Sequence, residues 1–204
     1  FIKNYIKNNK CSFVVFDIND LVSRDSLIQQ ADIVISMLPP VFHVLVAKSC
    51  INFKKNLITA SYVSEDVRTL HESAKKANIL ILNEIGLDPG IDHISAMQVI
   101  DSLNSEGAKI KSFKSFCGGL IAPESDDNPW NYKFTWNPKN VVLAGSSGAS
   151  YLKNGAIKNF SYKEVFLNTE SITIPNYGEF ESYANIDSLH YQKKYNLLDA
   201  HTIV

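Results

Sequence analysis

The chain has 204 residues, of which 45% are hydrophobic and 20% are charged, and its formal net charge is −1. These values are ordinary for a globular protein with enough apolar residues for one large domain or two small ones. The near-neutral charge argues against nucleic-acid binding, and no apolar run is long enough to predict a membrane span.

The first part of the chain predicts alternating strands and helices. Apolar runs predict strands over residues 12–18, 32–37, 56–60 and 78–83, and helical periodicity predicts helices over 24–30, 40–50 and 65–77. Ser64 is placed to cap the last of these helices. Short connections imply parallel strands with right-handed crossovers, and continuous apolar runs suit a sheet that is covered on both faces. This is the pattern of half a doubly wound nucleotide-binding domain.

A Gly-x-Gly-x-x-Gly phosphate loop does not occur in the sequence. Either the fold is not a dinucleotide-binding one, or its first strand and loop precede Phe1. The chain starts on Phe1 rather than on Met and stops on the apolar pair Ile203-Val204, so we expect a fragment of a longer protein. We therefore favour the second alternative.

The pattern changes after Leu87. A helix is predicted over residues 89–105, a strand over 109–117, a loop over 118–131, and weaker strands over 133–136, 156–162 and 183–187. We expect two domains: a partial dinucleotide-binding domain at residues 1–87 and a truncated α/β catalytic domain at residues 88–204.

The segment 83–93 concentrates three carboxylates, a histidine and two glycines. Asp88-Pro89-Gly90 is a good helix start, in which Asp88 would cap free amides; the same helix start at a strand end would also suit an anionic ligand. Asp92 can share a helix face with Asp88 or can be a solvated acid. His93 is either a polar helix residue or a ligand contact.

Three further side chains lie at the ends of predicted strands or just after them. Tyr62 can pack with a satisfied hydroxyl, or present that hydroxyl to a ligand. Cys117 precedes two glycines and is either a small buried hydrophobe or part of a site. Asp17 can contact an adenosine or cap the next turn. The cysteines Cys11, Cys50 and Cys117 are widely spaced, which predicts a reducing compartment and no metal site.

The assembled motifs resemble those of the saccharopine dehydrogenase family, in its glutamate-forming branch. The most specific are Leu87-Asp88-Pro89-Gly90-Ile91-Asp92-His93 and Cys117-Gly118-Gly119-Leu120. Further matching positions are residues 33–36, 42–43, 60–62, 83–86, 115–116, 122–124, 128–129 and 132–136. The resemblance covers nearly the whole chain.

The resemblance implies a Rossmann-type parallel sheet, its first strand and glycine-rich loop missing here, with an inserted α/β catalytic domain. It implies an oxidoreductase that uses NAD or NADP to convert saccharopine to L-glutamate and 2-aminoadipate 6-semialdehyde, or the reverse, in lysine metabolism. A homodimer, or a fusion to lysine–ketoglutarate reductase, would fit the family. We expect a cytoplasmic enzyme, or a mitochondrial one if its parent is an animal fusion protein.

Site residues follow from the resemblance position by position. The acid–base cluster falls on Tyr62, Asp88 and Cys117, and substrate contacts fall on Ser61, Tyr62 and Asp88. Cofactor contacts fall on Asp17, Ile18, Leu38, Ala60, Ser61, Leu87, Pro89, Gly90, Ile91, Asp92, His93 and Trp136.

One motif departs from the family. Residues 185–188 read Asn-Ile-Asp-Ser, with Ile186 at a position where the family has an arginine for a substrate carboxylate. Two alternatives therefore stay open: an imine-reducing dehydrogenase for another amino acid or polyamine conjugate, and a non-catalytic cofactor-binding homologue. The intact Tyr62, Asp88 and Cys117 favour an enzyme.

Overall fold

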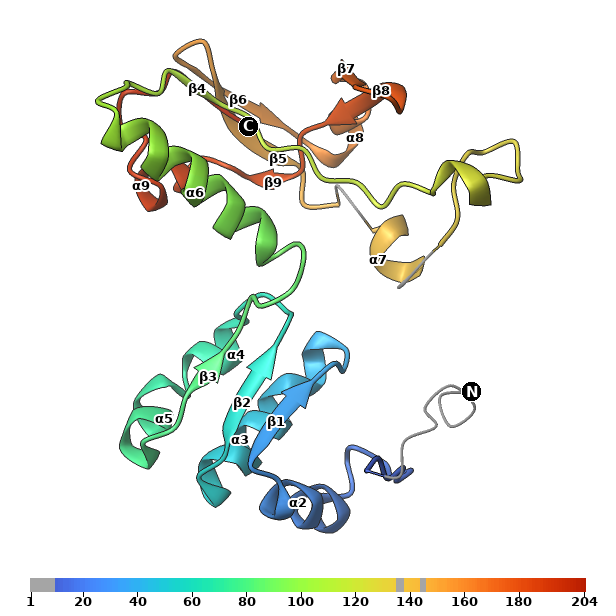
Figure 1. The fold of residues 1–204 in the computed structure, drawn as a ribbon, viewed down its shortest axis with the longest axis vertical. Coiled ribbons are helices and arrows are strands. Elements are labelled where there is room, and N and C mark those ends of the chain that lie inside the picture. Colours follow the sequence, from blue (N-terminus) through green and yellow to red (C-terminus); the bar gives the residue numbers. More distant parts are fainter. Residues whose placement is uncertain (1–9, 135–137, 144–145) are drawn as a thin grey trace. The chain divides into compact units, whose positions relative to one another are not determined.

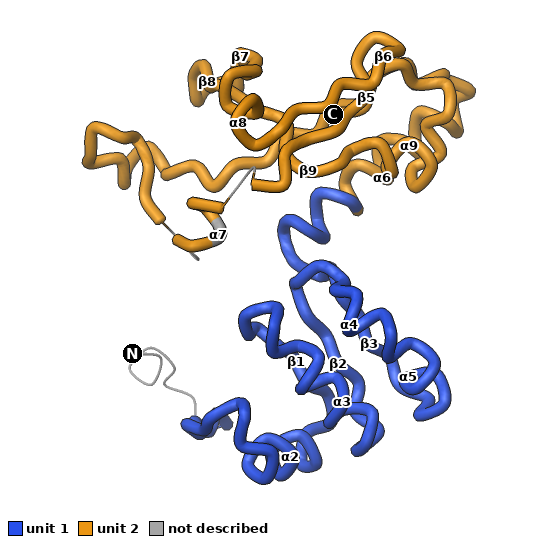
Figure 2. The backbone as a smooth tube through the Cα atoms, turned by 180° about the vertical axis from the view of Figure 1, so that it is seen from behind, with its two compact units in different colours: residues 1–93 blue, residues 94–204 orange. Residues whose placement is uncertain are grey.

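The chain forms two compact units. In this computed structural model, residues 10–134, 138–143 and 146–204 are described. The first unit comprises residues 1–93 and the second residues 94–204 (Figure 2). The division along the chain falls within the long helix α6 (Ile91–Ser105), six residues after the boundary that we predicted from the change in sequence pattern.

The first unit is built on a parallel sheet. Its strands are β1 (Ile33–Ser36), β2 (Asn56–Thr59) and β3 (Ile81–Leu82), in the order β1-β2-β3 (Figure 1). Val34 pairs with Leu57, and Leu57 pairs with Ile81, so all three strands run in the same direction. The predictions for residues 32–37, 56–60 and 78–83 are confirmed, with the last strand shorter than expected.

Among the described residues, one helix precedes these strands, and the others connect them. They are α2 (Leu21–Gln30), the 3-10 turn η1 (Pro40–Phe42), α3 (His43–Phe53), α4 (Glu65–Arg68) and α5 (His71–Ala77). Ser64 caps α4 by accepting a hydrogen bond from the Val67 amide, as predicted. The single helix predicted over 65–77 is wrong, because it is interrupted at Thr69 and Leu70. The Thr69 hydroxyl donates to the Asp66 carbonyl, which competes with continuation of the helix.

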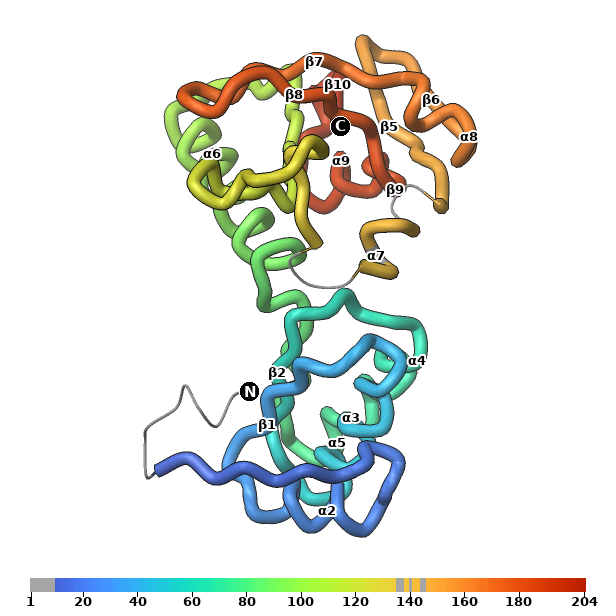
Figure 3. The backbone as a smooth tube through the Cα atoms, turned by 90° about the vertical axis from the view of Figure 1, so that its right-hand side faces the viewer, coloured from blue at the N-terminus to red at the C-terminus, as the bar shows by residue number. Residues whose placement is uncertain are grey.

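The helices gather on one face of the sheet (Figure 3). Ile28 of α2, Val46 and Cys50 of α3, and Leu57 of β2 form the buried core of the unit. Ile35 points away from this core and is 64% exposed. Among the described residues, therefore, one face of the sheet is covered, whereas the apolar runs had predicted cover on both faces.

The first predicted strand, residues 12–18, is wrong. The described part of this segment forms no ladder with β1, β2 or β3. Val14 and Val15 are 60% and 98% exposed. An apolar run becomes a strand only where a neighbouring strand pairs with its backbone, and neither β1, β2 nor β3 pairs with this segment.

The second unit combines α6 with a mixed sheet of order β4-β10-β5-β6, in which β9 also pairs with β5. The strands are β4 (Ser112–Phe113), β5 (Ala149–Lys153), β6 (Ala156–Phe160), β9 (Ile186–Asp187) and β10 (Thr202–Ile203). A separate hairpin joins β7 (Thr169–Ile174) to β8 (Gly178–Tyr183). The short helices are η2 (Pro123–Ser125), α7 (Pro138–Val142), α8 (Tyr162–Val165) and α9 (His190–Lys194).

The core of the second unit lies between α6, α9 and this sheet. Ile100 packs with Tyr195, Leu197, Ala200 and Ile203. No helix in the described ranges is long and apolar enough to span a bilayer.

Several predicted elements of this unit differ. The helix expected at 89–105 begins at Ile91, and the strand expected at 109–117 is only Ser112–Phe113, because its partner β10 offers two residues. The strand predicted over 156–162 is confirmed for residues 156–160 as β6, and Tyr162 begins α8. The strand expected at 183–187 is divided, since Tyr183 ends β8 and Ile186 begins β9. Residues 133–134 are not a strand, and 135–136 lie outside the described residues.

Candidate active site

A folded-back turn follows β3 and crosses onto the end of β2. The Glu84 amide donates to the Ser61 carbonyl at 3.0 Å, and the Ile85 amide donates to the Thr59 carbonyl at 3.3 Å. The Glu84 carboxylate accepts from the Val63 amide at 3.3 Å. These bonds attach residues 84–85 to residues 59–63, so two strand ends form one platform.

This platform brings together two of the predicted site residues. The Tyr62 hydroxyl donates to an Asp88 carboxylate oxygen at 2.9 Å, across 26 residues of sequence. Tyr62 is 50% exposed, and Asp88 is also exposed. A phenol and a carboxylate in hydrogen-bond contact, open to solvent, can hold or pass a proton to a ligand that lies over them.

Close backbone contact fixes the Asp88 turn. The Gly86 amide donates to the Pro89 carbonyl, and the Ile91 amide donates to the Gly86 carbonyl, at 2.9 and 3.0 Å. A Cβ at Gly90 would lie 2.2 Å from the Gly86 carbonyl oxygen, and Gly90 has φ +149°. Only glycine fits here. Leu87 and Ile91 are exposed on this turn, whereas Pro89 and Gly90 are buried.

Asp92 and His93 lie in the first turn of α6. An Asp92 carboxylate oxygen accepts from the Gly90 amide at 2.7 Å, which also holds the turn. Its other oxygen lies 3.8 Å from His93 Nε2. Capping by an acid is thus realised through Asp92, whereas the Asp88 carboxylate, which we predicted as the cap, accepts from Tyr62.

Sequence reasoning missed a buried histidine beneath the platform. His43, the first residue of α3, is 3% exposed. Its Nδ1 lies 2.9 Å from Ser36 Oγ, and its Nε2 lies 2.8 Å from Ser61 Oγ and 3.2 Å from Thr59 Oγ1. Burial lowers the pKa of His43, which favours the neutral ring. A lone histidine in a helical pattern gave no spacing signal for such a role.

Three residues that we predicted as cofactor contacts, Asp17, Ile18 and Leu38, lie before α2 or just after β1 in the first unit. The Asp17 carboxylate accepts from the Asn19 amide at 2.9 Å, so it does stabilise a turn. Ile18 and Leu38 are half-buried against the core. The buried Arg24 donates to the Ile18 carbonyl at 2.7 Å and holds this turn on α2. The structure does not bring these residues into contact with Tyr62 or Asp88.

The remaining predicted residues divide between the units. Ala60 follows the last residue of β2, and its Cβ lies 3.0 Å from where a Cβ on Gly86 would stand. Cys117 belongs to the second unit and is exposed; it follows β4 by several residues rather than ending it. Its convergence with Tyr62 and Asp88 stays a prediction. Trp136 lies outside the described residues.

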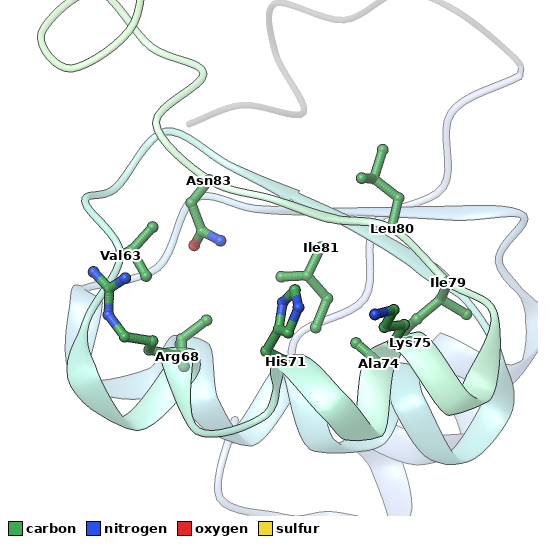
Figure 4. Close-up of a pocket in the computed structure, with 10 residues that line it drawn as sticks. Val63, Arg68, His71, Ala74, Lys75, Ile79, Leu80, Ile81 and Asn83 are labelled. Carbon is green, nitrogen blue, oxygen red and sulfur yellow. The ribbon is translucent and has the colours of Figure 1, made fainter. Parts of the chain in front are cut away.

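Two surface hollows are lined by neither Tyr62 nor Asp88. The larger, of about 630 Å³, lies in the first unit between β3 and α4–α5 (Figure 4). Ile81 and Ala74 line it together with the cationic Arg68 and Lys75, and none of the predicted site residues does. A second hollow, of about 470 Å³, lies in the second unit and is lined by Ile186, Asp187 and Ser150, among others.

The parallel strands and their connecting helices define an α/β protein, a class in which ligands bind at the carboxyl ends of the strands. Comparison with known families gives the particular group. The family model described as "Saccharopine dehydrogenase NADP binding domain" matches residues 2–82, and "Saccharopine dehydrogenase C-terminal domain" matches residues 86–204. The chain belongs to the saccharopine dehydrogenase family.

Individual relatives agree. The chain is 42% identical over 191 residues to a saccharopine dehydrogenase [NADP(+), L-glutamate-forming] of Pyricularia oryzae, covering 94% of this chain and 42% of that protein. It is 44% identical over 186 residues to an alpha-aminoadipic semialdehyde synthase of Arabidopsis thaliana, covering 90% of this chain and 18% of that protein.

A solved structure shares the fold. Apo saccharopine dehydrogenase (L-Glu forming) from Saccharomyces cerevisiae matches with a TM-score of 0.85 at 40% identity, covering 93% of this chain and 43% of that one. The chain therefore spans less than half the length of these relatives.

Proposed function

We propose that this chain contributes to an NADP-dependent saccharopine dehydrogenase that forms L-glutamate and 2-aminoadipate 6-semialdehyde. The observation that carries the proposal is the exposed Tyr62–Asp88 contact of 2.9 Å at the strand ends. Relatives that cover the chain almost completely bear this activity in their names, with NADP(+) as the cofactor. On the same basis we propose NADP rather than NAD.

The residues around this contact fit the nicotinamide end of such a cofactor. Ser61 is half-buried and offers a hydroxyl at the end of β2. Gly90 has no side chain to obstruct the turn that carries Asp88. When bound, the cofactor would supply the acceptor for hydride.

The substrate chemistry needs groups that move protons. Hydride leaves the carbon beside the secondary amine, which gives a C=N⁺ bond; water adds and loses a proton, and the C–N bond breaks to release glutamate and an aldehyde. The amine must be neutral before hydride leaves. Asp88 can take the proton from the amine or from water, with Tyr62 as its hydrogen-bonded partner. Cys117 is the third proposed member of the cluster.

The direct test uses the full-length enzyme with saccharopine and NADP⁺, with formation of the reduced cofactor followed by absorbance. Saccharopine-dependent reduction, with glutamate and the semialdehyde as products by mass spectrometry, is the expected result. Binding of NADPH without turnover on any substrate would instead favour the non-catalytic homologue.

Ile186 favours a second candidate, an imine-reducing dehydrogenase for another amino acid or polyamine conjugate. Saccharopine has three carboxylates, and an alkyl side chain cannot pair with one. A buried carboxylate that loses its partner costs about 3–5 kcal/mol. A screen of amino acids and carbonyl acceptors in the reductive direction would separate the two candidates.

A homodimer and a fusion to lysine–ketoglutarate reductase remain proposals about the whole protein. A mitochondrial location is proposed alongside a cytoplasmic one. The reason is that a relative from Rattus norvegicus, 44% identical over 182 residues, is named "Alpha-aminoadipic semialdehyde synthase, mitochondrial". Sedimentation of the full-length protein and its fractionation from cells test these points.

A further inference from the structure

We propose that His43 is a positioning residue that holds the Ser61 hydroxyl as a hydrogen-bond acceptor for an N–H group of the bound ligand. The inference rests on the proposed function in one respect only, which is that Ser61 lies at the ligand site. The role of His43 itself is argued from its surroundings.

His43 connects the ends of two neighbouring strands. Ser36 ends β1 and Thr59 ends β2, and the imidazole lies between them at the start of α3. Ser36 and Thr59 are 4% and 1% exposed, while Ser61 is half-buried. The ring therefore has a closed side at Ser36 and an open side at Ser61.

The contacts of the ring favour one tautomer in this proposal. Two hydroxyl oxygens, those of Ser61 and Thr59, lie within hydrogen-bond distance of Nε2. If Nε2 is unprotonated, these two hydroxyls share its lone pair and Nδ1–H donates to Ser36 Oγ, so three protons are engaged by the ring contacts, and the Ser36 hydroxyl proton needs another acceptor. If Nε2 is protonated, only its own proton and that of Ser36 are engaged, and the buried Thr59 hydroxyl needs another acceptor.

Thr59 supports this assignment. Its Oγ1 already accepts from the Ser61 amide at 3.3 Å, so its own proton is free to point at Nε2. Because burial lowers the pKa of His43, the ring stays neutral, as this arrangement requires.

The consequence for Ser61 is chemical selectivity. Its one proton is directed at Nε2, so the exposed side of the oxygen offers lone pairs. Such an oxygen receives an N–H donor and disfavours a carboxylate or a carbonyl oxygen. Both ligands of the proposed reaction carry N–H groups, namely the nicotinamide carboxamide and the amines of the substrate.

The tautomer can be measured without any ligand. The full-length protein is labelled with ¹⁵N-histidine, and the His43 signals are assigned by their loss in His43→Gln. The expected spectrum at neutral pH shows a protonated Nδ1 and a bare Nε2. A protonated Nε2 would overturn the proposal, and this result does not depend on whether saccharopine is the substrate.

The predicted effect on binding is tested with Ser61→Ala, His43→Leu and the double variant. We expect each single variant to lower the affinity for one ligand by about ten-fold, as for loss of one hydrogen bond. The double variant should bind that ligand no more weakly than either single variant. Titration of NADPH fluorescence measures the affinity for the cofactor, and the KM for saccharopine reflects the affinity for the substrate. The ligand whose binding is weakened is the one that donates its N–H group to Ser61.

His43→Gln is the conservative control, because its amide oxygen can still accept from Ser61. It should recover part of the affinity lost in His43→Leu. Circular dichroism and a urea transition show whether each variant folds. Folded variants that leave both affinities unchanged, or additive losses in the double variant, would overturn the proposal; if His43→Leu does not fold, His43→Gln and the tautomer measurement still decide it.

Discussion

At the scale of single residues, Asp88 has the most demanding role. It accepts from Tyr62 on an exposed surface, where a ligand can reach both groups. We predict that Asp88→Ala lowers kcat by about 100-fold or more, the range typical of general acid–base catalysis. The dissociation constant for NADPH should change little. Equal losses in turnover and in cofactor affinity would contradict a chemical role, and Glu65→Gln on α4 is a suitable exposed control.

Ile186 is the residue that most directly tests the substrate. It lies beside a hollow in the second unit and has φ +55°, which is unusual for a β-branched side chain. If saccharopine is the substrate, Ile186→Arg should lower its KM by about ten-fold or more, since an arginine pairs with a carboxylate. Ile186→Met controls for size. An unchanged KM in Ile186→Arg would favour a substrate that lacks this carboxylate.

At the scale of elements, the turn between β3 and α6 depends on Gly90. In Gly90→Ala the new Cβ would overlap the Gly86 carbonyl, so the turn must open and Asp88 must move. Gly107, after α6, also has positive φ, but nothing lies within 4 Å of its Cβ position. Gly107→Ala should lower the free energy of unfolding by about 1–2 kcal/mol, for the left-handed backbone alone. Gly90→Ala should lower it by more and should also lower kcat. Urea unfolding and kcat measure both; equal costs would contradict the steric argument.

His43 also gives a pH dependence at this scale. Burial lowers its pKa in the folded state below the ordinary value, which the unfolded chain retains at about 6.5. Below about pH 6.5 the unfolded state binds more protons at His43 than the folded state does. The contribution of His43 to the free energy of unfolding therefore falls as the pH falls through that value, and it does not change with pH above it. Urea midpoints across this range should vary less in His43→Gln. An identical slope in both proteins would contradict a buried neutral His43.

Prediction of strands from sequence succeeded where apolar residues lie in a segment that pairs with a neighbour. β1 and β2 were predicted from apolar residues such as Val34 and Leu57, which pair with each other, and the Ser64 cap has a well-known side-chain signature. β7 and β8 were missed because their exposure alternates without a deeply buried face. The Asn154-Gly155 pair, both with positive φ, marks the β5–β6 hairpin and could have revealed β5. The Tyr62–Asp88 contact followed from the family motif, but the His43 network depends on packing between distant segments.

At the scale of the whole molecule, the thiols report on the two units. Cys50 is buried, and burial raises its pKa to about 11, whereas Cys11 and Cys117 are exposed. Alkylation followed by peptide mass spectrometry should modify Cys11 and Cys117 quickly and Cys50 slowly. If Cys117 joins Tyr62 and Asp88 around the ligands, saturating saccharopine and NADPH should slow its labelling several-fold and leave Cys11 unchanged. Equal rates with and without ligands would place Cys117 outside the site.

The central claim is that Tyr62 and Asp88 act as one unit in the oxidation of saccharopine. The most direct measurement is kcat for saccharopine with NADP⁺ in the full-length enzyme, its Tyr62→Phe and Asp88→Asn variants, and the double variant. The account predicts that the double variant is no slower than the slower single variant, because groups that act together are not additive. Losses that multiply, or single variants as fast as the parent, would contradict it.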